Sequence, residues 1–122
     1  MTIQELYETI GGDYESAKRT LMMDAMISRF IVKFPDDPSF EKLMSASDSL
    51  DPTILFEGAH AMKGVCGNLG LISLSTLASK ITEEFRPGNT RSLSDEEVKQ
   101  ILNTISEQYT TAVQAIQAFA QE

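Results

Sequence analysis

Hydrophobic residues recur along nearly the whole chain at intervals of three and four, the spacing that places them on one face of an α-helix. No segment shows the alternation of apolar and polar residues that a half-buried strand requires. The longest stretch with the helical spacing of hydrophobic residues follows Ser94 and continues to Phe119. The pattern predicts an all-α protein made of amphipathic helices.

Local signals predict where the helices begin. In a capping box, a hydroxyl side chain and a glutamate three residues later each accept a backbone N–H of the other residue. Two pairs fit this rule, Thr2 with Glu5 and Ser94 with Glu97. Four aspartates can cap further helices: Asp13, Asp24, Asp37 and Asp51. Asp37 and Asp51 are each followed by a proline, which is favoured at the first helical position.

The resulting elements are two short helices near the N-terminus and longer ones after them. Gly11-Gly12 ends the first helix, and the Arg86-Pro87-Gly88-Asn89 sequence ends the helix before the last one. The third helix is expected to turn four side chains toward the core: Ile27, Phe30, Ile31 and Phe34. We predict an up-and-down antiparallel four-helix bundle over residues 24–122, preceded by a short N-terminal helical extension over residues 1–23.

Composition narrows the class of protein. A chain of 122 residues with 42% hydrophobic residues suits one domain with its own core. The net charge of −8 repels phosphate backbones, so nucleic acid is not an expected partner. There is no apolar run of about 18 residues and no basic leader, so no membrane association is expected. Cys66 is the only cysteine, which excludes an internal disulfide and favours a cytoplasmic location.

The segment from Asp51 to Ile72 carries the candidate chemistry. One seam of this helix is apolar and suited to packing: Leu55, Ala59, Met62, Cys66 and Leu69. His60 lies off this seam, and Lys63, Gly64 and Gly67 follow on its side, because residues three and four apart share a helix face. Glycine inside a helix costs about 0.5–1 kcal/mol relative to alanine. Gly58, Gly64 and Gly67 are therefore interpreted as an outward face that a partner protein approaches closely.

These residues alone leave other interpretations open. His60 could be an ordinary surface or core histidine, the glycines could serve helix–helix packing, and Lys63 could be a solvated charge. Cys66 is interpreted as a small buried hydrophobe. Phe56, one turn before His60, could be buried against a neighbouring helix or could contribute to a docking surface.

The sequence from His60 to Gly70 closely resembles the motif of histidine-containing phosphotransfer (HPt) domains, the relay modules of multistep two-component signalling. The matching positions are His60, Lys63, Gly64, Asn68, Leu69 and Gly70. Many members place serine or alanine after the Lys-Gly pair, whereas this chain has Val65, which points away from the His60 face by helical angle. The resemblance covers roughly residues 24–122 and implies a four-helix bundle with an exposed histidine.

The resemblance implies a role for each site residue. His60 would accept and donate a phosphoryl group, exchanged with an aspartate in the receiver domain of a response regulator or hybrid sensor histidine kinase. Lys63 would offset the added charge, and Gly64 would keep the space beside the imidazole open. Phe56, Gly67 and Asn68 are the expected partner-docking residues. A hydrogen-bond partner for the imidazole cannot be assigned, and Glu83, Glu84 and Lys80 are candidates by residue type only.

The function expected on these grounds is phosphoryl relay by a monomeric phosphocarrier that is not an enzyme with its own turnover. No cofactor is expected, and no metal site either, because the acidic residues lack metal-ligand spacing. One alternative is an HPt-like binding or scaffold module that docks a signalling partner without phosphotransfer. A bundle holding a metal or haem is disfavoured by the single histidine. A start methionine and a C-terminal helix favour a complete protein over a piece of a larger sensor kinase.

Overall fold

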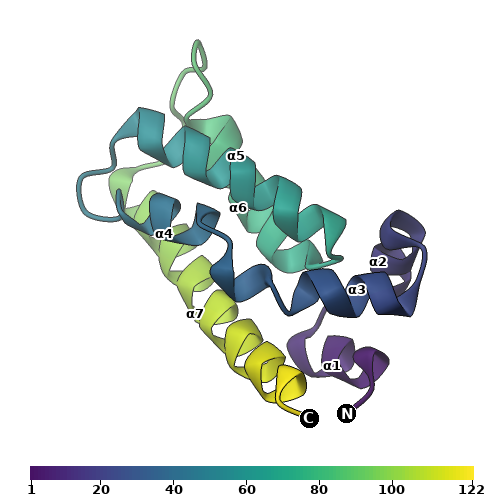
Figure 1. Ribbon diagram of the computed structural model, residues 1–122. Helices are drawn as coiled ribbons and strands as arrows, with labels where there is room; N and C mark the ends of the chain where they lie inside the picture. Colours follow the sequence, from purple (N-terminus) through teal and green to yellow (C-terminus); the bar gives the residue numbers. More distant parts are fainter.

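The computed structural model describes all 122 residues and is entirely helical, which confirms the predicted fold class (Figure 1). Its elements in chain order are α1 (Ile3–Ile10), α2 (Tyr14–Leu21), α3 (Asp24–Ile31), the 3₁₀ helix η1 (Phe34–Asp36), α4 (Ser39–Met44), α5 (Pro52–Asn68), α6 (Ile72–Glu84) and α7 (Asp95–Ala120).

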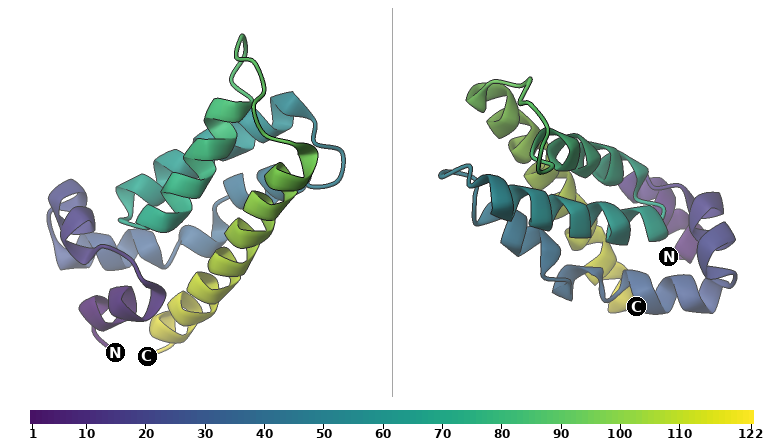
Figure 2. Two further views of the ribbon diagram at one scale, coloured as in Figure 1. Left: turned by 180° about the vertical axis from the view of Figure 1, so that it is seen from behind. Right: turned by 90° about the horizontal axis from the view of Figure 1, so that it is seen from above.

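The long helices form the predicted helical bundle. Figures 1 and 2 show α5 and α6 side by side and antiparallel, joined by a tight turn, with α4 against α5 and α7 running along α6 and α1. The remaining position in the bundle is shared by α3, η1 and α4. Pro35 lies within η1, where proline interrupts regular α-helical hydrogen bonding, so this part of the bundle is broken into short pieces.

One hydrophobic cluster of 24 buried side chains draws on every helix. The apolar seam predicted for α5 is confirmed, because none of its five residues is more than 4% exposed. The N-terminal helices belong to the same cluster through Leu6, Tyr7 and Ala17, all almost fully buried. The division at residues 23 and 24 therefore stays a prediction about domain boundaries, while α1 and α2 pack on the core of the bundle.

Most of the predicted helix starts are confirmed. Both capping boxes are present, with the Glu5 N–H donating to Thr2 Oγ1 at 3.1 Å and the Glu97 N–H donating to Ser94 Oγ at 3.1 Å. The Asp13 carboxylate accepts the Ser16 N–H at 2.9 Å, as expected of an N-cap. These signals depend only on residues within one turn, which explains why the sequence is sufficient to identify them.

The start of α3 differs from the prediction. Met23 takes the N-cap position without a side-chain hydrogen bond, so the prediction that Asp24 caps this helix is wrong. The Asp24 carboxylate instead accepts the Tyr14 hydroxyl and pairs with Lys18 at 3.6 Å, and both partners come from α2. Phe30, expected in the core, is 40% exposed. Contacts between α2 and α3 therefore decide this region rather than the local sequence.

The start of α4 is shifted by one residue. Asp37 was expected as N-cap with Pro38 as the first helical residue, but Pro38 itself occupies the N-cap position. The Asp37 carboxylate still accepts a backbone N–H, that of Ser39, at 2.9 Å. The capping interaction is thus retained although the helix begins one residue later.

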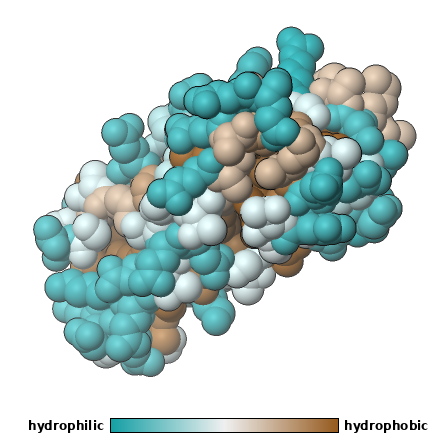
Figure 3. All heavy atoms as spheres, turned by 90° about the horizontal axis from the view of Figure 1, so that it is seen from below, coloured by the Kyte–Doolittle hydropathy of each residue, from teal (hydrophilic) through white to brown (hydrophobic).

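The surface is mostly hydrophilic, with hydrophobic atoms visible in its hollows (Figure 3). Paler brown atoms gather at the right-hand end of this view, over the α2–α3 end of the molecule, where Met22 and Met23 are 72% and 56% exposed. The two chain ends lie close together in Figures 1 and 2, and the Met1 ammonium pairs with the Glu122 carboxylate. None of the helices combines the length and the apolar character that crossing a bilayer demands.

Candidate functional site

His60 is the central residue of α5, with eight helical residues on each side, and its side chain is exposed. The helix is fixed at its start by Asp51, whose carboxylate accepts the N–H groups of Thr53 at 3.0 Å and Ile54 at 3.2 Å. Pro52 follows at the first helical position. Burial of the apolar seam on the opposite side then holds α5 in place, so that His60 is presented to solvent from a well-supported helix.

The three glycines of α5 have different surroundings. A β-carbon at Gly64 would meet no atom within 4 Å, so the space one turn after His60 is open. A β-carbon at Gly67 would lie 3.4 Å from Ser75 Oγ, an ordinary contact. One at Gly58 would lie 2.8 Å from the backbone N and Cα of Leu43. The interpretation of Gly58 as part of an outward face is therefore wrong, because this buried glycine permits the close packing of α4 on α5.

Lys63 lies on the side of His60 that faces α6. Its backbone carbonyl accepts the Ser75 hydroxyl at 3.1 Å, which ties α5 to the start of α6. Its side chain, half-buried, borders a shallow pocket lined entirely by polar residues, the others being Ser75, Thr76, Ser79, Lys80 and Glu83. Two ammonium groups, Lys63 and Lys80, thus border a polar hollow next to the histidine in a protein of net charge −8.

The imidazole of His60 stacks on one aromatic ring, which in turn contacts a guanidinium group held by an ion pair. The ring of Phe56 is nearly parallel to that of His60, with an interplanar angle of 11° and 5.7 Å between ring centroids. The guanidinium of Arg86 lies 5.4 Å from the centroid of the Phe56 ring. Arg86 is in turn held by Glu83, donating from Nε to Oε2 at 3.0 Å and from Nη2 to Oε1 at 2.8 Å. The site therefore joins α5 to the end of α6.

The charges of this cluster act on Glu83. The hydrogen bond from Arg86 lowers the pKa of the Glu83 carboxyl below its ordinary value, and the nearby charges of Arg86, Lys63 and His60 act in the same direction. Glu83 thus stays ionised and available to Arg86 in mildly acidic solution. From the sequence, Glu83 is a candidate hydrogen-bond partner of the imidazole by residue type only, and no site role is predicted for Arg86.

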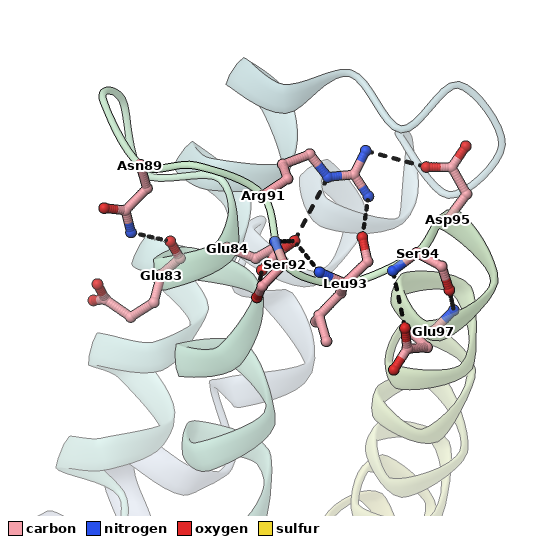
Figure 4. A network of polar contacts seen from close by, with 9 residues as sticks. All are labelled: Glu83, Glu84, Asn89, Arg91, Ser92, Leu93, Ser94, Asp95 and Glu97. Atoms are coloured by element: carbon pink, nitrogen blue, oxygen red, sulfur yellow. Dashed lines mark hydrogen bonds and ion pairs between the residues drawn. The ribbon is translucent and has the colours of Figure 1, made fainter.

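Two of the three candidates for an imidazole hydrogen bond, Glu83 and Glu84, have other partners, and the Lys80 side chain makes no hydrogen bond or ion pair. No side chain or backbone group of the protein makes a hydrogen bond with the imidazole of His60. Glu84 points instead into the α6–α7 loop, where it accepts the N–H groups of Ser92 at 2.9 Å and Leu93 at 2.7 Å and the Ser92 hydroxyl at 3.0 Å (Figure 4). Arg91 Nε lies 3.6 Å from the same carboxylate. Glu84 is therefore a loop-holding residue rather than a contact of the histidine.

The end of the His60–Gly70 motif is held by the N-terminal helices. The Tyr7 hydroxyl donates to the Leu69 carbonyl at 2.6 Å, and the Asp13 N–H donates to the Gly70 carbonyl at 2.7 Å. Gly70 has φ of 72°, and a β-carbon there would lie 2.3 Å from the Asp13 carbonyl oxygen. Only glycine fits both the backbone conformation and this close approach. Gly70 is thus required by the fold at the turn between α5 and α6.

Two other side chains complete the description of α5. Cys66 is fully buried, and burial raises the pKa of its thiol to about 12, so it packs as a small hydrophobe, as predicted. Asn68, near the end of the helix, is exposed, and Val65 is half-buried against the core. No group of three or more His, Cys, Asp or Glu side chains lies close enough together to hold a metal ion.

The structure thus presents an exposed histidine in the middle of a bundle helix, with a lysine and an open glycine one turn on. In a comparison with protein families, the model of the Hpt domain matches residues 25–119. The chain belongs to the Hpt domain family, whose members perform histidine phosphotransfer in phosphorelays. No curated protein and no solved structure shows significant similarity to the chain. Helices α1 and α2 lie outside the matched residues.

Proposed function

We propose that this protein relays a phosphoryl group between His60 and an aspartate in the receiver domain of a response regulator or hybrid sensor histidine kinase. The observation that carries this proposal is the placement of the only histidine in the chain, exposed at the centre of α5 beside the open space at Gly64. Family membership supports histidine phosphotransfer in general, and the residue and its partner are our assignment.

The transfer step is a displacement at phosphorus. Nε2 of the neutral His60 imidazole attacks the phosphorus of the aspartyl phosphate, the bond from phosphorus to the carboxylate oxygen breaks, and the aspartate carboxylate leaves. The reverse step returns the phosphoryl group to a receiver. An imidazole is largely neutral, and so nucleophilic, near neutral pH. Such a transition state is loose and in line, so catalysis depends mostly on positioning and on stabilisation of charge.

The neighbours of His60 receive roles on this basis. Lys63 offsets the charge of the phosphorylated imidazole as a point charge on a flexible side chain. Gly64 leaves room for the receiver to bring its aspartate close to the ring. Phe56, Gly67 and Asn68 form the docking surface around this space. We also propose that the protein acts as a monomer in the cytoplasm.

We further propose that the protein is a phosphocarrier without catalytic turnover of its own, since the partner contributes the group that reacts with His60. This role requires neither a nucleotide nor a cofactor. The alternative, an HPt-like scaffold, predicts binding of the receiver without labelling. The retention of His60, Lys63 and Gly64 around an open space favours phosphotransfer over that alternative.

The test is transfer of labelled phosphate from a panel of phosphorylated receiver domains. We expect the wild type to acquire an acid-labile label, as phosphohistidine does, and His60→Gln to acquire none. A matched control is the double variant His60→Gln with Gln100→His, which moves the imidazole to an exposed position on α7. Absence of label in this control would show that the setting of α5 is needed. Label retained in His60→Gln would refute the assignment of the site.

A further inference from the structure

The imidazole of His60 has one specific contact within the protein, the ring of Phe56 one turn earlier on α5. An interplanar angle of 11° with a centroid separation of 5.7 Å is an offset parallel stack, a favoured arrangement of two rings. No group of the protein hydrogen-bonds to the imidazole, so this stack is the contact available to orient the ring plane. Residues four apart on a helix are placed to make such a contact.

Phe56 is itself held from two directions. Its side chain is half-buried and packs against the hydrophobic core. The Arg86 guanidinium lies 5.4 Å from the ring centroid, within the range of a cation–π contact, and is fixed by two hydrogen bonds to Glu83. The backbone around Arg86 is fixed as well, because the Asn89 side-chain amide donates to the Glu83 carbonyl at 2.7 Å (Figure 4). One support of Phe56 thus comes from the hydrophobic core and the other from Arg86, just after α6.

We propose that Phe56 is a positioning residue that fixes the imidazole of His60 in one orientation for phosphoryl transfer, with Arg86 holding Phe56 from the end of α6. This inference rests on the proposed function and assigns a role to the stack that is separate from docking. Phe56 and Arg86 do not exchange bonds with the phosphoryl group. They act through the orientation of the ring that does.

The size of the effect follows from the side-chain conformations open to a histidine on a helix. One of the three staggered χ1 positions is rare in helices, and χ2 is roughly two-fold, which leaves about four orientations. If the stack holds the productive orientation and its loss makes all four comparable, the population of the productive orientation falls by about three- to four-fold. The rate constant for transfer at saturating receiver should fall by the same factor.

The first measurement examines the stack without any phosphotransfer. Because the chain has a single histidine, its imidazole proton resonances in an NMR spectrum belong to His60 alone. In the wild type these protons lie close to the Phe56 ring and should show its ring-current shift. Phe56→Leu should abolish that shift, Phe56→Tyr should retain it, and the control Phe119→Leu on α7 should leave it unchanged. A shift that persists in Phe56→Leu would overturn the proposal.

The second measurement separates positioning from docking. We expect Phe56→Leu to lower the rate constant at saturating receiver by about three- to four-fold, a change that the loss of a docking contact alone would not cause, and Phe56→Tyr to restore the rate. Arg86→Gln should give a smaller decrease. If only the half-saturating concentration rises in Phe56→Leu, Phe56 is a docking contact and the proposal is wrong. A wild type that accepts no phosphoryl group would refute the proposed function itself, whereas a labelled wild type with unaffected Phe56→Leu would refute only this inference.

Discussion

The two glycines Gly58 and Gly64 lie six residues apart on α5, yet the structure predicts opposite effects of replacing each with alanine. At Gly64 the new methyl group would meet no atom, and alanine is favoured over glycine in a helix by about 0.5–1 kcal/mol. For a protein of 122 residues this gain corresponds to a rise of about 2–4 °C in Tm. Gly64→Ala should therefore stabilise the protein.

At Gly58 the same methyl group would lie 2.8 Å from backbone atoms of Leu43. Backbone cannot move aside as the end of a flexible side chain can, so α4 would have to shift away from α5. Forcing extra volume into a well-packed region costs about 1–3 kcal/mol, and the gain in helix propensity offsets only part of that cost. Gly58→Ala should therefore lower Tm, by about 2–8 °C.

The order of the two variants by transfer rate should be the reverse of their order by Tm. Gly64→Ala places a methyl group where the receiver is proposed to approach His60, and a displacement of about 1 Å in the reacting groups can cost up to 100-fold in rate. We expect a more stable protein that transfers several-fold more slowly. Gly58→Ala changes nothing on the exposed face, so its transfer rate, measured below its Tm, should stay near that of the wild type.

The assay combines thermal melting followed by circular dichroism with the initial rate of label transfer from one phosphorylated receiver. Asn103→Ala, an exposed position on α7, serves as the control for a stabilising substitution away from the site. A lower Tm in Gly64→Ala would refute the view that the space beside this glycine is open. A normal transfer rate in the same variant would refute the argument that the receiver needs that space.

Other predictions concern the supports of the site. Lys63→Ala should slow transfer while changing Tm by little, since the hydrogen bond from Ser75 goes to the Lys63 backbone carbonyl, which alanine retains; a large fall in Tm with normal transfer would make Lys63 structural. Tyr7→Phe should lower the free energy of unfolding in urea by about 1–3 kcal/mol, because the buried Leu69 carbonyl loses its donor, and an unchanged value would contradict this reading of the α1 contact. Glu84→Gln should cost a similar amount at neutral pH by weakening the hydrogen bonds that hold the α6–α7 loop.

The Glu84 prediction also has a pH dependence. Burial, the largest single effect, raises the pKa of the Glu84 carboxyl, but the hydrogen bonds from Leu93 and Ser92 and the contact with Arg91 together bring it below the ordinary value of 4.5. A carboxyl whose pKa is lower in the folded state contributes stability above its unfolded pKa and loses it as pH falls through the folded pKa. The difference in urea stability between wild type and Glu84→Gln should thus shrink in acid. A difference independent of pH would contradict the assignment.

Several features of the fold could be predicted because they depend on neighbouring residues in the chain. The capping boxes and the seam of α5 are of this kind, and so is the outward direction of His60, since a step of about 100° per residue places it off the seam. The same step places Gly58 about 160° from His60, so its burial also follows from helical geometry. The sequence alone is therefore sufficient to separate Gly58 from the face that carries Gly64.

Other features depend on how helices meet and could not be predicted from local patterns. Asp24 is drawn to Tyr14 and Lys18 of α2, which removes it from its expected capping role. Arg86 belongs to a loop-forming sequence, and its contact with Phe56 exists only because α5 and α6 lie side by side. The role of Tyr7 and Asp13 in holding the end of α5 likewise requires the placement of α1 and α2 on the bundle.

The single histidine has a consequence for the amount of signal that the protein can store. Under the proposed function, each molecule carries one phosphoryl group or none, because no second imidazole exists to accept another. The stored signal in a cell is then bounded by the number of copies of this chain. Graded output must come from the fraction of molecules loaded, and changing the expression level would change the capacity of the relay directly.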